Sequence, residues 1–380
     1  MKLVFIHDHK LVKYKDNYYT TGGFSDTITN RYTSIFHNMT LICRLSEKND
    51  ISKLIKISNQ DVNIVSVEGN ILFPKKRNIK LLKEEILKAD NIIVRLPSIL
   101  GIYAAAISLK MKKRLCIEVV GNIFGSYWYK SILGKFVAIP IEILDKIIIK
   151  KAEYVLYVSD IYLQKKYPNN KINIGCSDVV LAERDLNILS HRLKKIAAFN
   201  KNEKVIFGTL AQYNQKYKGH ETVFKSMATL KKEGYKFEYR LAGSGDATLI
   251  HKLISKYHLE NEIILNGLIK HENINDWFDN IDIYIQPSLT EGLPRSVIEA
   301  LYRACPVIVS TAGGMYELID KKYIFKKGNN RELTNIIRNI SNISLVEMSK
   351  RNFDFASKFE PDYLNEKRTN FYKKFCDGEK

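Results

Sequence analysis

Residues 287–301 read PSLTEGLPRSVIEAL and hold two glutamates, Glu291 and Glu299, eight positions apart. The apolar run IDIYIQ precedes this stretch, and Pro294 stands where the first turn of a helix would begin. The pattern predicts a buried strand, a short loop that carries Glu291, and a helix that carries Glu299. Unpaired backbone N–H groups at the start of such a helix suit a phosphate group. We therefore expect a diphosphate between the two carboxylates, with a sugar at one and ribose hydroxyls at the other.

Short apolar runs alternate with helix-like segments on both sides of this stretch. Six runs precede residue 182, namely KLVFIH, MTLICRL, VNIVSV, NIIVRLP, RLCIEVV and EYVLYVS, and five follow residue 203, namely KVIFGTL, FEYRLAG, NEIILNG, IDIYIQPS and CPVIVST. A strand-then-helix rhythm is typical of a parallel sheet covered on both faces. The sequence therefore predicts an α/β protein with two doubly wound domains in tandem.

The 380 residues exceed the roughly 250–300 at which a single core stops growing. Between the two sets of runs lies a polar, charge-rich segment without a strand pattern. We predict an N-terminal domain over 1–182, a linker over 183–203, a second domain over 204–355, and a C-terminal helical segment over 356–380 that returns to the first domain. Ligands of parallel sheets bind at the carboxyl ends of the strands, so a cleft between two facing domains is the expected binding place.

The net charge of +19 suggests a polyanionic partner, either nucleic acid or an anionic membrane surface. A Lys-rich composition that merely coats the surface explains the same charge. The lysines are spread along the chain and no nucleic-acid-binding motif accompanies them, so we expect no nucleic acid partner.

Cysteine usage and hydropathy bear on location. The five cysteines form no CxxC pair and no spacing suited to a metal, which favours reduced thiols in the cytoplasm. The apolar run before His7 is too short for the core of a signal peptide, and no run reaches the eighteen or so residues of a membrane span. We expect a cytoplasmic protein, with a peripheral position on the inner membrane left open.

The segment EGLPRSVIE, with PS before it and EALYRACPVIVSTAGGMYELI after it, resembles family 4 of the retaining glycosyltransferases with the GT-B fold. The mark of this family, the glycosyl transferases group 1, is Glu, seven residues, Glu, and the resemblance covers most of 204–330. It implies two Rossmann-like domains facing across a cleft, a donor sugar at Glu291 and the nucleotide ribose at Glu299. The implied reaction moves a sugar from a nucleotide-diphosphate donor, with a UDP-sugar as the favoured donor, to a glycan or polyprenyl-diphosphate-linked acceptor. The configuration at the anomeric carbon is retained.

The same resemblance implies that no cofactor and no bound metal are needed, and it is strongest to bacterial enzymes of capsule, O-antigen or lipopolysaccharide assembly. Matching segments are FGTLAQYNQKYKGHETVFKSM, LAGSGD and LNGLIKHENINDWF. The implied catalytic residues are Glu291 and Lys218, the lysine as a charge against the leaving diphosphate. The implied donor-binding residues are Gly208, Thr209, Lys218, Gly219, Gly243, Gly245, Leu268, Ile269, Glu291, Gly292, Leu293, Pro294, Arg295, Ser296 and Glu299. Gly22, Gly23 and Asn122 are the implied acceptor and phosphate loop residues.

The sequence departs from the family pattern at three places. Residues 209–212 lack the arginine that usually follows the strand glycine. We therefore expect Lys218, together with Arg295 or the backbone, to stabilise the donor phosphates. The segment IEVVGNIFGSYWYKS lacks the usual histidine, and Asn122 or a neighbour is expected in its place. Ala304-Cys305 replaces a residue pair that commonly contains Gly. His7 and His9 form an HxH pair, but no third metal ligand accompanies them.

Two alternatives in function and one in surface use stay open. A nucleotide-sugar 2-epimerase has the same fold, and a non-catalytic basic protein would bind polyanions or act as a scaffold. The segment 125–154 joins aromatic residues and long apolar runs to lysines at 130, 135, 146, 150 and 151. It is either a surface that lies on an anionic bilayer or a core helix with a solvated lysine face. The oligomeric state is not indicated.

Overall fold

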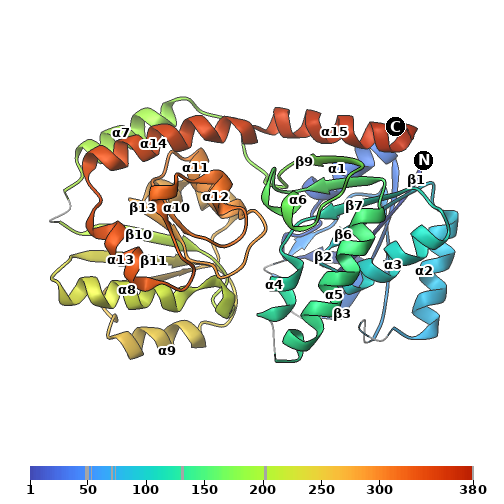
Figure 1. Ribbon diagram of the computed structural model, residues 1–380, viewed down its shortest axis with the longest axis horizontal. Helices are drawn as coiled ribbons and strands as arrows, with labels where there is room; N and C mark the ends of the chain where they lie inside the picture. The colour runs from blue at the N-terminus through green and yellow to red at the C-terminus, as the bar shows by residue number, and fades with distance from the viewer. Residues whose placement is uncertain are drawn as a thin grey trace. The chain divides into compact units, whose positions relative to one another are not determined.

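The structure is a computed structural model that describes residues 1–47, 51–52, 54–69, 72, 74–129, 132–200 and 203–378 (Figure 1). The chain forms two compact units. Unit 1 comprises Met1–Cys176 together with Asn365–Lys380, and unit 2 comprises Ser177–Leu364. Each unit is built on its own sheet of mainly parallel strands, which confirms the predicted α/β fold class.

The described residues of unit 1 form nine strands, β1 (Lys2–Tyr14), β2 (Asn17–Thr20), β3 (Asn38–Glu47), β4 (Ile55–Lys56), β5 (Val62–Ser66), β6 (Asn91–Leu96), β7 (Leu115–Val119), β8 (Tyr154–Tyr157) and β9 (Ile172–Gly175). Seven of them are parallel in the order β5-β3-β1-β6-β7-β8-β9. The order reverses between β1 and β6, and such a reversal is where parallel sheets commonly bind ligands.

The segment after the first predicted strand forms a hairpin, which the sequence analysis did not predict. Strand β1 continues to Tyr14, which pairs with Asn17 of the antiparallel β2 across a two-residue turn. Lys15 in this turn has φ 52°. Alternating apolar and polar residues in HKLVKYKDNYYT carry this strand pattern, and the charged side chains between them obscured it.

The helices of unit 1 are α1 (Asp26–Phe36), α2 (Lys76–Lys88), α3 (Ile99–Lys110), α4 (Ile123–Trp128), α5 (Ile132–Lys151) and α6 (Tyr162–Lys166). A Cβ on Gly101 of α3 would touch Val94, whereas the neighbouring Arg95 contacts Tyr32 of α1. Adjacent strand residues point to opposite faces, so α1 and α3 cover opposite faces of the sheet. Helix α3 also contacts α2 and α5.

The C-terminal helix α15 (Pro361–Asp377) ends in unit 1, as the sequence predicted. Its Tyr372 ring packs on Phe36 of α1 and its hydroxyl donates to the buried carboxylate of Glu118 on β7. Arg95 donates to the same carboxylate over 2.8 Å. Helix α15 therefore closes the core of unit 1 on the α1 side.

In unit 2, the part of the chain that the structure describes forms six parallel strands in the order β12-β11-β10-β13-β14-β15. They are β10 (Val205–Leu210), β11 (Phe237–Ala242), β12 (Ile263–Gly267), β13 (Ile283–Gln286), β14 (Val307–Ser310) and β15 (Ile324–Phe325). The sequence predicted all of them except the two-residue β15. Because the order reverses between β10 and β13, the loops after these two strands are where a ligand is expected to bind.

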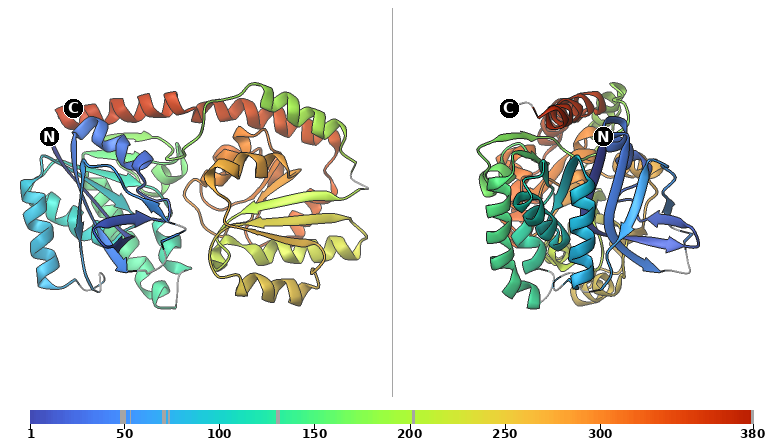
Figure 2. Two further views of the ribbon diagram at one scale, coloured as in Figure 1. Left: turned by 180° about the vertical axis from the view of Figure 1, so that it is seen from behind. Right: turned by 90° about the vertical axis from the view of Figure 1, so that its right-hand side faces the viewer.

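Helices cover both faces of this sheet (Figures 1 and 2). They are α7 (Asn187–Ala197), α8 (His220–Lys232), α9 (Thr248–Tyr257), α10 (Ile274–Asp279), α11 (Arg295–Tyr302), α12 (Met315–Leu318), α13 (Asn330–Arg338) and α14 (Asn342–Ala356). Helix α8 contacts α9 and α13, whereas α11 contacts α14.

Residues 187–197, which the sequence placed in a linker, form helix α7 and belong to unit 2. The helix packs on α14, and its three buried residues are Ile188, Arg192 and Ile196. Arg192 occupies a core position because its guanidinium donates to the carbonyl oxygens of Ile281 and Phe278 over 2.7 and 2.8 Å. A charged residue on the buried face concealed the helical pattern. The boundary between the units accordingly falls after Cys176, not after 182.

Candidate active site

Glu291 lies in the loop between β13 and α11, where the sequence expected it. Three donors converge on its Oε1 atom, namely Lys218 Nζ at 2.7 Å, Ser288 Oγ at 2.7 Å and Gln286 Nε2 at 3.4 Å. The side chain is 13% exposed. Within the part of the chain that the structure describes, Oε2 accepts no hydrogen bond, so one carboxylate oxygen is left for a ligand.

Lys218 reaches Glu291 from the loop that follows β10. It ends a 3₁₀ turn, Lys216–Lys218, and precedes Gly219 and helix α8. Burial lowers the pKa of Lys218, but the Glu291 carboxylate outweighs burial and leaves this pKa above its ordinary value. The lysine therefore stays charged. The loops after the two central strands thus contribute one positive and one negative group to a single cluster.

The two loops are in backbone contact. Leu289 N donates to Tyr217 O over 2.7 Å. Gly219 has φ 75°, and a Cβ there would lie 2.0 Å from the carbonyl oxygen of Pro287. Only glycine permits both this backbone conformation and this close approach. The Lys218–Glu291 pair therefore depends on Gly219 for its geometry.

Gly219→Ala is expected to lower the free energy of unfolding by at least about 3 kcal/mol, because left-handed strain and a backbone collision add up. Gly234→Ala is the matched control, since Gly234 has φ 80° but no atom within 4 Å of an added Cβ. The control should lose only about 1 kcal/mol from the left-handed backbone. Urea denaturation of both variants measures the difference, and equal losses would show that the contact with Pro287 does not matter.

Glu299 lies inside α11, and its carboxylate has no hydrogen-bond or ion-pair partner among the described residues. Burial raises its pKa, and the nearby charge of Arg295 opposes the shift. Arg295 is exposed at the first position of α11 and also lowers the pKa of Lys218. Arg295 therefore lies close enough to influence both the lysine and the second glutamate. An unpaired carboxylate near one cation, Arg295, is free to accept hydrogen bonds from hydroxyls.

A hydrogen-bonded network of buried polar side chains, which the sequence analysis missed, contacts Glu291. Gln286 accepts from Tyr284 over 2.5 Å and from Ser296 over 3.2 Å, and it donates to Ser288 over 2.9 Å. Gln286 and Ser288 are both fully buried. The available signal was the polar residues that end the apolar run IDIYIQPS. Ser296, predicted to bind the donor, is one member of this network.

Glycines hold the surrounding loops close to one another. Gly313 has φ 64°, and a Cβ there would lie 2.5 Å from the carbonyl oxygen of Glu291. Gly314 N donates to Gly292 O over 2.7 Å. A Cβ on Gly243 would lie 1.9 Å from Ala211 O. The structure thus places the predicted Gly292 and Gly243 in loops that follow the strand ends.

Five further predicted donor-binding residues of unit 2 lie in three loops. Leu268 and Ile269 follow β12, with the Leu268 side chain 63% exposed. Gly245, with φ 103°, follows β11, and Leu293 and Pro294 are buried in the loop before α11. These positions are compatible with the predicted contacts, which stay predictions.

Gly208 and Thr209 are different, because both are used inside the sheet. A Cβ on Gly208 would lie 2.7 Å from Ile281. The buried Thr209 hydroxyl donates to Ile285 O over 2.6 Å and accepts from Tyr239 over 2.8 Å. Packing explains the glycine, and hydrogen bonds between strands occupy the threonine hydroxyl. The Thr209 hydroxyl is therefore not free to bind the sugar donor, whereas the predicted role of Gly208 stays a prediction.

In unit 1, the predicted Gly22 and Gly23 follow β2 and stand beside His9. A Cβ on Gly23 would lie 2.9 Å from the His9 ring, and Gly22 has φ 122°. Burial lowers the pKa of His7 to about 3 and also lowers the pKa of His9, so both rings are neutral. These residues pack the turn after β2 against the middle of β1.

Asn122 caps helix α4, accepting from Gly125 N over 3.2 Å and from the Tyr167 hydroxyl over 3.3 Å. Both hydrogen bonds to its side-chain oxygen thus come from groups of the protein itself. Whether Asn122 takes the place of the missing family histidine stays a prediction. Within the described ranges, no group of three or more His, Cys, Asp or Glu side chains is arranged to hold a metal ion.

His220 is a residue that the sequence analysis passed over. It follows Gly219, is buried, and donates from Nε2 to Gln212 O over 3.0 Å. Burial lowers its pKa to about 4, so it is neutral. It holds the loop after β10 against the start of α8, two residues from Lys218.

Two units, each built on a sheet of mainly parallel strands, are the architecture of the GT-B fold. The fold is similar to that of Alr3699/HepE from Anabaena, a structure determined with UDP and glucose, with a TM-score of 0.67 and 14% identity over 98% of this chain and 99% of that one. The likeness to this structure concerns the fold alone.

The family model "Glycosyl transferases group 1" matches residues 191–353. Protein CapJ of Staphylococcus aureus is 36% identical over 349 residues, which are 89% of this chain and 85% of CapJ. The putative colanic acid biosynthesis glycosyltransferase WcaL of Salmonella typhimurium is 29% identical over 110 residues, 27% of each chain. The chain belongs to the glycosyl transferases group 1 family, which confirms the resemblance seen in the sequence.

Proposed function

We propose that this glycosyltransferase moves a sugar from a UDP-sugar to a glycan or polyprenyl-diphosphate-linked acceptor, with retention at the anomeric carbon, in the assembly of a bacterial capsule, O-antigen or lipopolysaccharide. The observation that carries the proposal is the Lys218–Glu291 pair at the carboxyl ends of β10 and β13, beside the unpaired Glu299. UDP is favoured by the ligand of HepE, and polysaccharide assembly by the name of WcaL.

In this proposal each charged group of the site has a role. Lys218 and Arg295, with the backbone N–H groups at the start of α11, offset the negative charge of the diphosphate as it leaves. Glu291 meets the donor sugar through its open oxygen, and Glu299 accepts from the ribose hydroxyls. With two cations available for the diphosphate, the proposal includes no bound metal and no cofactor.

Retention follows if the acceptor hydroxyl attacks from the face that the leaving group vacates. The bond between the anomeric carbon and the diphosphate oxygen breaks, and the bond to the acceptor oxygen forms on the same face. The acceptor proton passes to the departing diphosphate oxygen. The protein contributes position and charge stabilisation in this scheme, and no side chain becomes covalently attached.

Family membership favours transfer over the 2-epimerase alternative. Among the described residues, no helix combines the length and hydropathy that crossing a membrane requires. A cytoplasmic location, peripheral to the inner membrane, is part of the proposal.

Nucleotide binding tests the donor site. Among UDP, GDP, ADP, CDP and TDP, we expect UDP to give the largest rise in Tm of the wild type. Glu299→Gln should weaken UDP binding about tenfold or more, because hydrogen bonds to a charged acceptor contribute roughly 1.5–3 kcal/mol and 1.4 kcal/mol is a factor of ten. Isothermal calorimetry measures the change.

Glu238→Gln is the control, since Glu238 is a glutamate on β11 with Lys204 and Arg240 as its partners. Its UDP affinity should equal that of the wild type. No stabilisation by any of the five nucleotides would favour the scaffold alternative and overturn the proposal. The anomeric configuration of the product, read by nuclear magnetic resonance, tests retention, and inversion would contradict it.

A further inference from the structure

Helix α5 of unit 1 presents an apolar face to solvent. Seven large apolar side chains of this helix are each between 46 and 78% exposed, namely Ile132, Leu133, Phe136, Ile139, Ile143, Leu144 and Ile147. Globular proteins commonly expose single apolar side chains, but a continuous row along one helix marks a surface that binds something.

The exposed row is distinct from the face that α5 buries in the unit. The buried residues are Gly134, Ala138, Ile141, Asp145, Ile148 and Ile149. At 3.6 residues per turn, the seven exposed side chains span an arc of about 140° on the opposite side of the helix. A surface helix normally carries polar residues on that side. Helix α2 does so, with exposed Lys76, Arg77, Lys80 and Lys83.

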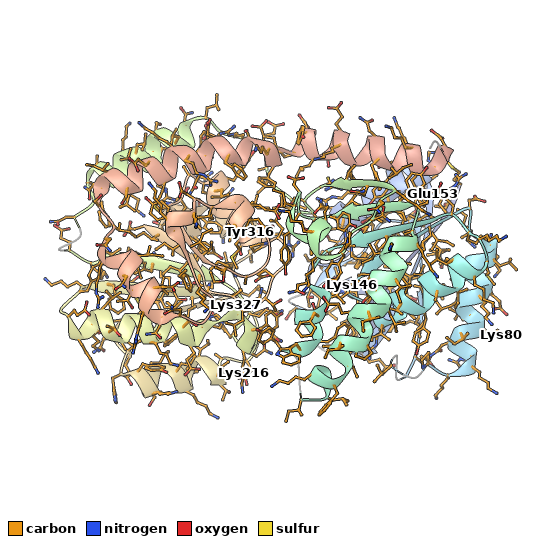
Figure 3. The ribbon with its side chains drawn as sticks, in the orientation of Figure 1. Lys80, Lys146, Glu153, Lys216, Tyr316 and Lys327 are labelled. Carbon is orange, nitrogen blue, oxygen red and sulfur yellow. The ribbon has the colours of Figure 1, made fainter. Side chains whose placement is uncertain are left out.

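Lysines flank the exposed face of α5, and its two acids are withdrawn from it. Lys135, Lys146, Lys150 and Lys151 are exposed, and Figure 3 shows Lys146 on the α5 ribbon. Asp145 is buried. Glu142 pairs with Lys166 over 3.1 Å and lies 3.9 Å from Lys146. The exposed face therefore combines apolar side chains with positive charge only.

Aromatic residues extend this surface beyond the N-terminal end of the helix. The rings of Phe124 and Trp128 on α4 stack with centroids 5.0 Å apart, and Lys135 Nζ lies 5.7 Å from the Trp128 ring. Lys130, which the sequence analysis included in this surface, lies outside the described residues. Aromatic and basic side chains at the edge of an apolar face are typical of helices at a lipid interface.

We infer that α5 lies on an anionic lipid bilayer, with its apolar face among the acyl chains and its lysines at the headgroups. Charge complementarity selects this occupant. A second copy of the chain would bring the same lysines together, and the exposed face offers no carboxylate to receive them. A bilayer with acidic headgroups meets both the apolar and the basic side chains. The inference rests on the proposed function and deepens it, because an enzyme on the bilayer surface can reach a lipid-linked acceptor.

Vesicle sedimentation with the full chain tests the inference. The wild type should pellet with vesicles of phosphatidylglycerol and phosphatidylcholine, and should stay in solution with phosphatidylcholine alone. The triple variant Phe136→Ser/Ile139→Ser/Ile143→Ser should lower the apparent affinity for the anionic vesicles at least tenfold. Its matched control is Leu87→Ser/Ile264→Ser/Ile343→Ser, which removes three exposed apolar side chains outside α5 and should bind like the wild type.

The charge contribution has its own pair of variants. Lys135→Gln/Lys146→Gln should weaken vesicle binding, whereas Lys80→Gln/Lys327→Gln, at two exposed lysines elsewhere (Figure 3), should not. The rise in Tm with UDP should be unchanged in every variant, so a failed donor site and a failed membrane surface give separate results.

Three outcomes would overturn the inference. One is equal sedimentation of the wild type with both kinds of vesicle, and another is equal binding by the α5 triple variant and its control. The third is a wild-type dimer in analytical ultracentrifugation that the α5 variant alone dissociates, without vesicle binding by either protein. That result would assign the face to a second copy of the chain.

Discussion

Glu291→Gln is expected to lower kcat for sugar transfer by about 10²- to 10³-fold, the usual cost of removing one preorganised charged group from an active site. The amide cannot balance the charge of Lys218, which sits 2.7 Å from the carboxylate in a partly buried site. Burial then acts unopposed on the lysine and lowers its pKa, which weakens its charge against the diphosphate. Release of UDP at saturating donor measures the rate.

Glu238→Gln separates this loss from a general effect on the unit. Glu238 is also a mostly buried glutamate with a lysine at 2.7 Å, but it lies on β11 away from the loops after β10 and β13. Both variants should lose some stability, and only Glu291→Gln should lose the rate. Lys218→Met should produce a similar loss, and the double variant should lose little more, because the two residues act as a unit. Full rates in both single variants would remove the pair from the mechanism.

Local signals explain why the strand, loop and helix around Glu291 were predictable. A short apolar run predicts a strand, and Pro294 marks the start of a helix within one residue of where α11 begins. These signals act within a few residues of the chain. The contact between Lys218 and Glu291 spans 73 residues, and only the resemblance to a family suggested it.

Tertiary contacts explain what was missed. Gln286 looked like the polar end of a strand, and only the fold brings it to Glu291, Ser288 and Ser296. The sequence suggested that Thr209 binds the sugar donor, but its hydroxyl is hydrogen-bonded to residues of the two adjacent strands. Arg192 looked like part of a polar linker, because nothing in the sequence shows the carbonyl groups that accept its hydrogen bonds. Each depends on partners far along the chain.

Asp145→Asn is expected to stabilise the protein, and by more as the pH rises. The Asp145 side chain is fully buried in α5, and neither carboxylate oxygen has a hydrogen-bond partner. Burial, assisted by the charge of Glu142, raises its pKa from 3.8 to about 8. Between these values the folded protein keeps the proton that the unfolded chain has lost. Unfolding therefore releases a proton, and the free energy of unfolding falls by up to about 1.4 kcal/mol per pH unit.

The variant carries a neutral amide of nearly the same shape and has no proton to lose, so this penalty disappears. Its advantage over the wild type should be small near pH 4, grow up to about pH 8, and stay constant above. Urea denaturation across this range measures it. Asp16→Asn, at an exposed aspartate in the β1–β2 turn, should show no such growth. A difference for Asp145→Asn that does not change with pH would contradict this prediction. It would mean that the carboxyl group ionises equally in the folded and the unfolded chain, despite its burial without hydrogen-bond donors.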